Sequence, residues 1–444
     1  MENYTSKQEF TARQKQILSL VRKGLTNQEI CRVLNISANT VKVHLANIYR
    51  IMDVSNRTEA VSLGMPELIN VKCVPEIKIL VIQKENFDNP KMNMFAFLMN
   101  QNLQRYNLFQ VLNAPMESRD GKITYQVILT GTLDSKPTLY LSLYDGTMTQ
   151  LLWAYSQKIN EHSNIDFLSN QMTMLLYRQM LISAAKSFDR GENLKPNWWY
   201  VSAFVNYKLN CRNRESFEKC ECELQTEFQK GPVNTFVKFS LVRLYYTAIT
   251  EMWVELQMYI DKIQELACSS MRDEPYSVYS RLMMALYNIL SGNKKDAITY
   301  LLMVTKANPE NIWASILLSQ IYLLMGEENK ALELLDECER VFPDLENDPN
   351  QIVPKSLIYF LLKKYDECEK YALRAAYIRQ ESVYPLLLMI LCRMVKDDVS
   401  SADPYKKMLF KYHPDFKISD CTKLLNGINP DCRKKIEVLL KRVF

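Results

Sequence analysis

Four short segments in residues 1–66 place apolar residues at helical spacing, and capping residues mark where the segments start or stop. Thr11 precedes the first segment, and Gly24 follows it as a C-cap. Thr26 begins the second segment, and Glu29 completes a capping box three residues later. The apolar residues that these two helices are expected to bury are Ile17, Leu18, Leu20, Val21, Ile30, Val33 and Leu34.

A tight turn separates the second segment from a third, which Ser37 can cap and which runs to Met52. A fourth helix is expected from about Asn56 to Pro66. The predicted buried residues of the third and fourth helices are Val41, Leu45, Ile48, Ala60, Val61 and Leu63. Two short helices joined by a tight turn form the helix-turn-helix pattern. Residues 1–66 are therefore predicted to be an all-α helix-turn-helix domain.

Between residues 75 and 190 the apolar period changes from that of a helix to that of a strand. Strands are predicted in the runs IKILVI, FQVL, ITYQVILTGTL, TLYLSLYD and QLLWAYSQKI. Helices are expected over residues 94–106 and 167–188, and Asp145 with Gly146 indicates a hairpin between the last two strands. This pattern predicts a small α+β domain.

Residues 196–444 have a helical pattern, and part of it repeats with a period of 34 residues. The matched positions are Gly292 and Gly326, Ala297 and Ala331, Leu301 and Leu335, and Pro309 and Pro343. This is the tetratricopeptide period, with glycine at the turn between two helices, alanine where the helices approach and proline ending the unit. Such repeats bury one continuous core and leave a concave surface for peptides or partner helices.

Two further parts of this region extend the pattern. A third copy can be traced through Val353, Tyr365, Ala372 and Tyr377, offset by the insertion DPNQIV. The helices of residues 198–229 and 235–266 are interpreted as degenerate repeats. We therefore expect an α-helical tetratricopeptide-like solenoid over residues 196–444, which makes the chain a multidomain protein with three parts.

Composition narrows the class of protein. Hydrophobic residues make up 48% and charged residues 24% of the chain, close to the averages of soluble globular proteins. No stretch is long and apolar enough to span a membrane, and the start, MENYTSKQEFTARQK, lacks the apolar core of a signal peptide. We therefore expect a cytoplasmic protein with no membrane partner. With three histidines and ten glycines there is no phosphate-cradling loop, nucleophile elbow or HExxH helix, so no enzyme is expected.

Two groups of residues could be interpreted as a ligand or metal site, but each is better explained in another way. Trp153 and Tyr155 lie in a predicted strand, where aromatic residues are more often core than ligand contacts. Cys211, Cys220 and Cys222 match none of the usual zinc spacings. The 11 scattered cysteines are expected to be reduced thiols in the core, and neither a metal nor a cofactor is expected.

The net charge of +5 is concentrated at the start of the chain. Residues 1–65 hold nine Lys or Arg and five Asp or Glu, a net charge of +4, so the remainder is almost neutral. A small basic domain joined to a large neutral region indicates that the first alone contacts a polyanion. The alternative for any single basic residue is an ordinary solvated helix face.

The third helix is the expected DNA-reading element, because its predicted buried face leaves a polar and basic face outward. Lys42 can donate to a guanine edge or a phosphate, and Val43 can contact a thymine methyl. Asn47 can pair with adenine or hold a phosphate, whereas Arg50 and Arg57 are expected to neutralise phosphates. The complete predicted set of residues that contact double-stranded DNA is Thr40, Lys42, Val43, Ala46, Asn47, Arg50 and Arg57.

The run from Phe10 to Val61 resembles the LuxR/GerE-type helix-turn-helix over its full length. The agreeing positions include Gly24, Leu25, Glu29, Ile30, Ile36, Ser37, Thr40, Val41, Lys42, His44, Asn47, Ile48, Val54, Arg57 and Ala60. The chain departs from the usual glutamate, basic residue, lysine and glycine of that family at Gln14, Ala46, Ile51 and Asp53. The resemblance implies a homodimer that binds two DNA half-sites, with the fourth helix pairing and His44 as a packing residue.

The strands and helix that end the middle region resemble the TolB-like domain. That domain lies between a helix-turn-helix and tetratricopeptide repeats in regulators of the HilA and CadC groups. The resemblance to the HilA group implies that the protein activates transcription. No receiver domain precedes the helix-turn-helix and no membrane span follows residue 66, so control by abundance or by a protein docked on the repeats is expected.

Two other classes of function remain to be weighed against a DNA-binding transcription regulator. The chain could be a tetratricopeptide scaffold whose helix-turn-helix contacts proteins, which the departures at Gln14, Ala46 and Ile51 would favour. It could also be an enzyme in the middle domain, but no convergent Asp, Glu, His or Ser motif supports that class.

Overall fold

The computed structural model divides the chain into two compact units, unit 1 with residues 1–73 and unit 2 with residues 74–444. The residues that the structure describes are 11–22, 27, 30–31, 36–52, 77–83, 89–106, 108–112, 123–132, 137–192, 197–211, 214–230, 234–308, 311–342, 348–396, 398–417, 419, 430–442 and 444. None of the helices in these ranges is long and apolar enough to cross a membrane.

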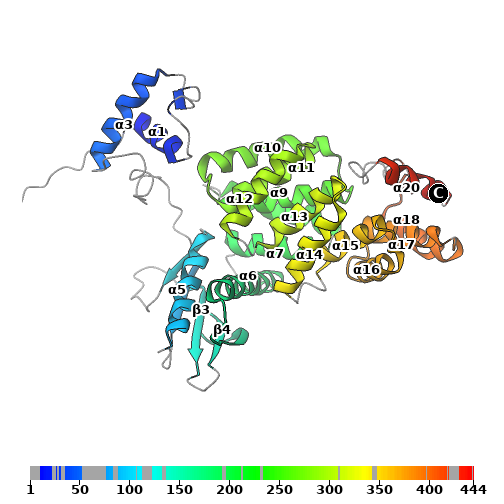
Figure 1. Ribbon diagram of the computed structural model, residues 1–444, viewed down its shortest axis with the longest axis horizontal. Coiled ribbons are helices and arrows are strands. Elements are labelled where there is room, and N and C mark those ends of the chain that lie inside the picture. Colours follow the sequence, from blue (N-terminus) through cyan, green and yellow to red (C-terminus); the bar gives the residue numbers. More distant parts are fainter. Residues whose placement is uncertain are drawn as a thin grey trace, which may run out of the picture. The chain divides into compact units, whose positions relative to one another are not determined.

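Unit 1 contains two described helices, α1 (Ala12–Arg22) and α3 (Ala38–Met52), which pack against each other (Figure 1). The buried core of its described residues is Ile17, Leu18, Leu20, Val21, Ile30, Val41, Leu45 and Ile48. Each of these residues was predicted to be buried, so the faces predicted for these two helices are confirmed. Most of the predicted second helix and all of the fourth, with Arg57 at its start, lie outside the described residues.

Unit 2 begins with a five-stranded sheet in the order β2-β1-β3-β4-β5. Its strands are β1 (Ile77–Gln83), β2 (Phe109–Leu112), β3 (Tyr125–Gly131), β4 (Thr138–Asp145) and β5 (Leu151–Lys158). Strand β1 is parallel to β2 and β3, and the remaining pairs are antiparallel. Helix α5 (Pro90–Arg105) connects β1 to β2, and α6 (Ile165–Asp189) follows β5 and packs against α5. The predicted small α+β architecture is confirmed.

The hairpin between β4 and β5 has a five-residue loop in place of a two-residue turn. The Asp145 carboxylate organises the loop by accepting from the backbone N–H of Gln150 at 2.7 Å and from the Thr149 hydroxyl at 3.1 Å. A side chain at Gly146 would place its Cβ 1.8 Å from the carbonyl oxygen of Ile123. Glycine is therefore required there by the close approach of the two backbones.

The two aromatic residues of β5 behave differently. Their rings stack with centroids 5.7 Å apart. Trp153 is half-buried and packs against the main core, whereas Tyr155 keeps 36% of its surface exposed. The expectation that these aromatics are core residues is confirmed for Trp153 and wrong for Tyr155, because β5 is the edge strand of the sheet.

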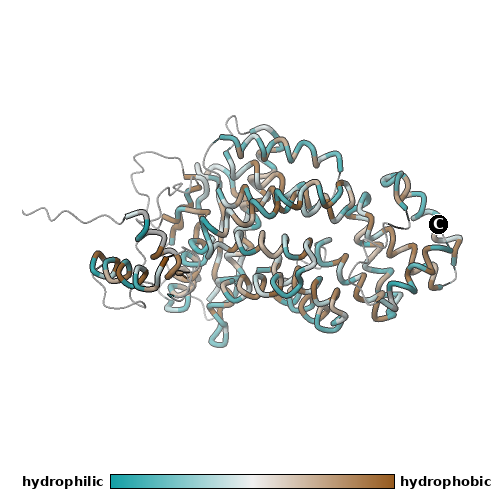
Figure 2. The backbone as a smooth tube through the Cα atoms, turned by 90° about the horizontal axis from the view of Figure 1, so that it is seen from above, coloured by the Kyte–Doolittle hydropathy of each residue, from teal (hydrophilic) through white to brown (hydrophobic). Residues whose placement is uncertain are grey.

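The rest of unit 2 is an array of helices that follow one another in sequence order from α7 to α18 (Figure 1). They are α7 (Trp198–Cys211), α8 (Glu215–Gln229), α9 (Thr235–Thr250), α10 (Leu256–Asp273), α11 (Val278–Leu290), α12 (Lys294–Ala307), α13 (Ile312–Leu324), α14 (Glu328–Val341), α15 (Pro349–Leu361), α16 (Tyr365–Ile378), α17 (Val383–Val395), the 3-10 helix η3 (Ser400–Ala402), α18 (Asp403–Tyr412) and α20 (Pro430–Lys441). Figure 2 shows hydrophobic and hydrophilic stretches alternating along these helices, as expected where each helix buries one face.

Among the described residues, four pairs of neighbouring helices in the array are connected by the same backbone turn. The second residue after the first helix of each pair has a positive φ: 58° at Met252, 77° at Gly292, 80° at Gly326 and 60° at Lys363. In each turn this residue and the next donate backbone hydrogen bonds to carbonyls of the preceding helix, for example from Gly292 to Ile289 and from Asn293 to Asn288. This is the Schellman motif, in which glycine is favoured because it has no Cβ.

The shared turn fixes the register of the third repeat copy. The small residue that lies five positions after the turn is Ala297 in one pair and Ala331 in the next, and both are fully buried. Counted from Lys363, the equivalent residue is Cys368, which is also fully buried. The insertion DPNQIV is the start of α15, with Asp348 as its N-cap. The predicted third copy is therefore confirmed as α15 and α16.

The sheet and the helical array share one hydrophobic core. Trp199 of α7 is fully buried, and its Nε1 donates to the Tyr125 hydroxyl of β3 at 3.1 Å. The hydroxyls of Tyr177 in α6 and Tyr279 in α11 lie 2.9 Å apart. The sequence places a domain boundary between residues 190 and 196. That boundary stays a prediction, since the chain on both sides belongs to unit 2.

The positive φ values predict opposite effects of substitution at two equivalent turns. Gly292→Ala should lower the free energy of unfolding by about 1 kcal/mol, because a Cβ is unfavourable in the left-handed region. Lys363→Gly should raise it by several tenths of a kcal/mol, because it removes the same penalty. Urea unfolding of the full chain, followed by circular dichroism, measures both. Ser291→Ala, one residue before the turn with φ of −78°, is the control and should change little. A loss of stability in Lys363→Gly would contradict this explanation.

Candidate nucleic-acid interface

The start of α3 is fixed by hydrogen bonds from the side chain that the sequence identified as its cap. The Ser37 hydroxyl accepts from the backbone N–H of Thr40 at 3.1 Å and lies 2.8 Å from the Thr40 hydroxyl. Just before it, the backbone N–H of Ile36 donates to the carbonyl of Cys31 at 3.1 Å. These bonds set where α3 begins, and so which of its residues point outward.

Helix α3 buries one face and exposes the opposite one. Val41, Leu45 and Ile48 are at most 5% exposed and pack in the core of unit 1. At about 100° per residue, the positions three or four apart on the other side form a continuous outward face. The exposed residues of that face are Thr40, Lys42, Val43, Ala46 and Arg50, and Asn47 is half-buried at its edge.

This outward face of α3 carries cationic, apolar and amide side chains close together on one helix. Lys42 and Arg50 supply positive charge, and Val43 is 53% exposed although it is apolar. The net charge of residues 1–65, +4, has the same sign. Cations suit phosphates, the amide suits a base edge and the apolar group suits a thymine methyl. The helix therefore carries the chemistry that major-groove recognition requires.

The structure explains one departure from the family pattern. Gln14 Oε1 accepts from the backbone N–H of Thr11 at 2.8 Å, and the Thr11 hydroxyl accepts from the backbone N–H of Gln14 at 3.2 Å. This reciprocal pair is a capping box in which glutamine serves as well as glutamate. The three-residue spacing of Thr11 and Gln14 is the sequence signal for this capping box, although Gln14 departs from the usual glutamate of the family. The substitution preserves the start of α1.

Six of the seven residues predicted to contact DNA lie on α3, and Arg57 lies outside the described residues. Thr40 has a second role that the sequence did not reveal, because its hydroxyl and backbone N–H both bond to the cap. His44 is half-buried at the border of the core, consistent with a packing residue.

The cysteines that invited a metal site do not form one among the described residues. No group of three His, Cys, Asp or Glu side chains there is placed to hold a metal. Cys220 is buried, and burial raises the pKa of its thiol to about 12, which keeps it protonated. Cys220 is therefore a core thiol as predicted, whereas Cys222 is exposed, contrary to that prediction.

Comparison with known proteins places the similarity at the start of the chain. The model of the family described as bacterial regulatory proteins, luxR family, matches residues 8–63. The putative HTH-type transcriptional regulator YhjB of Escherichia coli (strain K12) is 51% identical over 51 residues, which are 12% of this chain and 26% of that protein. The transcriptional regulatory protein LiaR of Bacillus subtilis (strain 168) is 44% identical over 59 residues, 13% of this chain and 28% of that protein. The chain therefore spans about a quarter of the length of the curated relatives that it matches.

Among solved structures, the helical array is similar in part to the crystal structure of the APC/C hetero-tetramer Cut9-Hcn1. The sequence identity is 12% and the TM-score 0.41, over 63% of this chain and 52% of that chain. The pilF protein of Pseudomonas aeruginosa gives 16% identity and a TM-score of 0.33, over 49% of this chain and 93% of that chain. At these scores the likenesses add nothing to the helix-pair architecture described above.

The family match and the geometry of α3 agree on the same residues. The caps, the buried residues and the outward face of α1 and α3 all fall within the matched range. Residues 8–63 are a LuxR-family helix-turn-helix, the DNA-binding domain of transcription regulators.

Proposed function

We propose that the protein regulates transcription by binding specific DNA sequences through the outward face of α3. The observation that supports this most directly is the separation of that helix into a buried apolar face and an exposed face with Lys42, Val43 and Arg50. Arg57, which follows α3 in the sequence, would add a phosphate contact. Sequence-specific binding follows from Lys42 and Asn47 at base edges, and register on the duplex follows from the phosphate contacts.

The protein would bind as a homodimer. A dimer places two copies of α3 in successive major grooves about 34 Å apart, so the operator would contain two related half-sites. In this proposal the segment after α3 pairs the two copies. Unit 2 supplies regulation, through a protein partner or through oligomerisation. The TolB-like nature of its sheet, a HilA-like or CadC-like architecture and a cytoplasmic location stay predictions from the sequence.

The alternative is a tetratricopeptide scaffold whose helix-turn-helix contacts proteins. Its support came from the family departures, and the capping box formed by Gln14 removes one of them. The exposed cations of α3 and the net charge of +4 over residues 1–65 favour a polyanion over a protein partner.

Arg50→Ala tests the phosphate contacts. Each phosphate that the protein neutralises adds about 0.9 to the slope of log affinity against log salt. Arg50→Ala should weaken binding to all sequences alike and reduce that slope by about 0.9 for each copy of Arg50 that contacts a phosphate. The measurement is fluorescence anisotropy of the full-length protein on selected genomic fragments at several salt concentrations. Lys295→Ala, an exposed lysine on α12 of unit 2, is the control and should leave the slope unchanged.

Asn47→Ala and Lys42→Ala test the reading of bases. Losing a bidentate base contact removes about 1–3 kcal/mol of discrimination, so the preference at one base position in each half-site should be relaxed. The readout is the set of fragments recovered by the wild type and each variant from a pool of genomic DNA. Wild-type protein that shows no preferred fragment and no salt dependence would favour the scaffold.

Activation is the proposed sign of regulation. Deleting the gene should lower the expression of reporter fusions to the promoters that the protein binds, and restoring the wild-type gene should recover it. The Asn47→Ala variant, expressed at the same level, should fail to restore expression. Higher expression in the deletion strain would show a repressor instead.

A further inference from the structure

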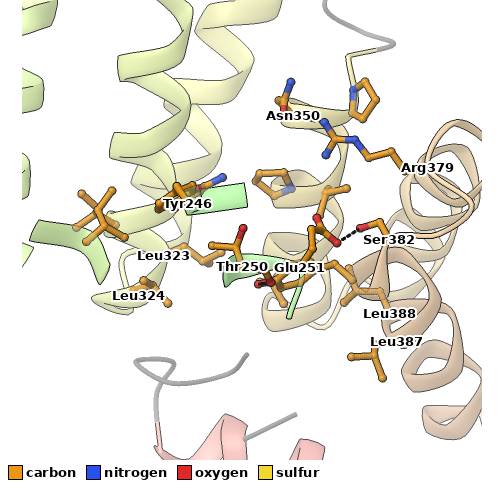
Figure 3. Close-up of a pocket in the computed structure, with 18 of the residues that line it drawn as sticks. Tyr246, Thr250, Glu251, Leu323, Leu324, Asn350, Arg379, Ser382, Leu387 and Leu388 are labelled. Atoms are coloured by element: carbon orange, nitrogen blue, oxygen red, sulfur yellow. Dashed lines mark hydrogen bonds between the residues drawn. The ribbon is translucent and has the colours of Figure 1, made fainter. Parts of the chain in front are cut away.

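Two cavities in unit 2 are lined by described residues, and their polar groups differ. The larger has a volume of about 560 Å³ and a wall rich in leucine (Figure 3). Its polar side chains bond to one another: the Ser382 hydroxyl donates to Glu251 Oε2 at 2.9 Å, and the Arg379 guanidinium donates to Asn350 Oδ1 at 2.7 Å. The bond between Ser382 and Glu251 joins segments 131 residues apart in the sequence, so this cavity has a clear structural role.

The smaller cavity, about 200 Å³, lies between α6 and the first helices of successive pairs. Tyr177 and Arg178 line it from α6, and Arg243 of α9 and Trp313 of α13 line it from the array. Helix α6 therefore covers part of the inner, concave surface of the array. The repeat pattern predicted that this surface would be open to peptides or partner helices. Sites between two structural layers of this kind are common places for small ligands.

Arg243 is held in a fixed orientation in the wall of this cavity. Arg243 is only 8% exposed, and its guanidinium carbon lies 4.0 Å from the centroid of the Trp313 ring. One terminal nitrogen donates to Asn206 Oδ1 at 2.5 Å and the other to Asn210 Oδ1 at 3.3 Å. Stacking and two amide contacts fix the plane of the guanidinium, which suits recognition of a planar anion.

The charges around the cavity favour an anion. Its charged lining residues are Arg178, Arg243 and Asp348, two cations and one carboxylate. Asp348 accepts from the backbone N–H of Asn350 at 2.8 Å and from its side-chain amide at 3.0 Å, which commits that carboxylate to the start of α15. Among the described lining residues the cations outnumber the carboxylate, so an anionic group placed at Arg243 would be attracted there.

The remaining wall is aromatic. Tyr106 and Tyr177 stack with ring centroids 4.6 Å apart, and Tyr279 and Phe239 lie on the array side with centroids 5.2 Å apart. Burial raises the pKa of Tyr177 and of Tyr279 well above the usual value, so both phenols stay neutral. Flat apolar faces of this kind pack well against another ring.

We propose that this cavity binds a small aromatic carboxylate, with the carboxylate at Arg243 and the ring among the aromatic side chains. The volume of about 200 Å³ suits one ring with a carboxylate. Such a ligand touches both α6 and the array, so its binding stabilises the contact between them.

The first test uses the full-length protein without DNA, so its outcome is separate from that of the proposed DNA contact. Benzoate and phenylacetate are titrated by calorimetry, and thermal unfolding is followed in parallel. Both acids should bind saturably at one site and raise the unfolding temperature. Acetate has the charge without the ring, benzyl alcohol has the ring without the charge, and neither should do so. The absence of saturable binding of either acid at millimolar concentrations overturns the proposal.

Variants locate the site. Arg243→Met should weaken benzoate binding at least about tenfold, because a charge-assisted hydrogen bond is lost. Ile182→Phe, on the α6 side, leaves Arg243 in place and should abolish binding by filling the cavity. Leu388→Phe narrows the larger cavity instead and should have no effect. Loss of binding in Leu388→Phe, with normal binding in a folded Ile182→Phe, would place the ligand in the larger cavity and overturn the proposal.

Discussion

The burial of Trp199 is the constraint on which the organisation of unit 2 depends. This side chain is fully buried, and its ring lies 5.4 Å from that of Phe109 in β2, 6.3 Å from Tyr177 in α6 and 6.0 Å from Phe236 in α9. Its only polar group donates to Tyr125 of β3. One residue thus contacts the sheet, the helix that covers it and the helical array. Because neighbours from all three parts pack against one buried side chain, the sheet, α6 and the helical array share one packed core.

That packing changes what the helical array offers to a partner. An isolated array of helix pairs would leave its whole inner surface open. Here α6 packs against α7, and the hydroxyls of Tyr177 and Tyr279 meet across the junction. What remains open beside α6 is a cavity that is small, aromatic and lined by a stacked arginine. This part of the inner surface is therefore better suited to a small molecule than to a second helix, while the outer helices keep exposed apolar residues such as Tyr377, which is 82% exposed.

Local sequence patterns predicted the elements of this fold better than their long-range packing. Helix α3 was predicted from Ser37 to Met52 because a cap and an apolar period mark it locally. The turns at Gly292 and Gly326 were visible because glycine marks a positive φ. The equivalent turns at Met252 and Lys363 carry no such mark, since methionine and lysine are not residues that indicate a positive φ. The shared core around Trp199 and both cavities also lay beyond prediction, because they join residues far apart in the chain.

The small core of unit 1 separates the residues that stabilise it from those that can vary. Small domains bury a lower fraction of their surface, so each cap contributes a large share of their stability. The caps at Thr11 with Gln14 and at Ser37 with Thr40 hold α1 and α3 in place, while Lys42, Val43 and Ala46 are exposed and pack against no core residue. Residues on that outward face can change with little loss of stability. The alanine at position 46, where the family often has a basic residue, is therefore compatible with the fold of the domain, and under the proposed function it would affect only which DNA is bound.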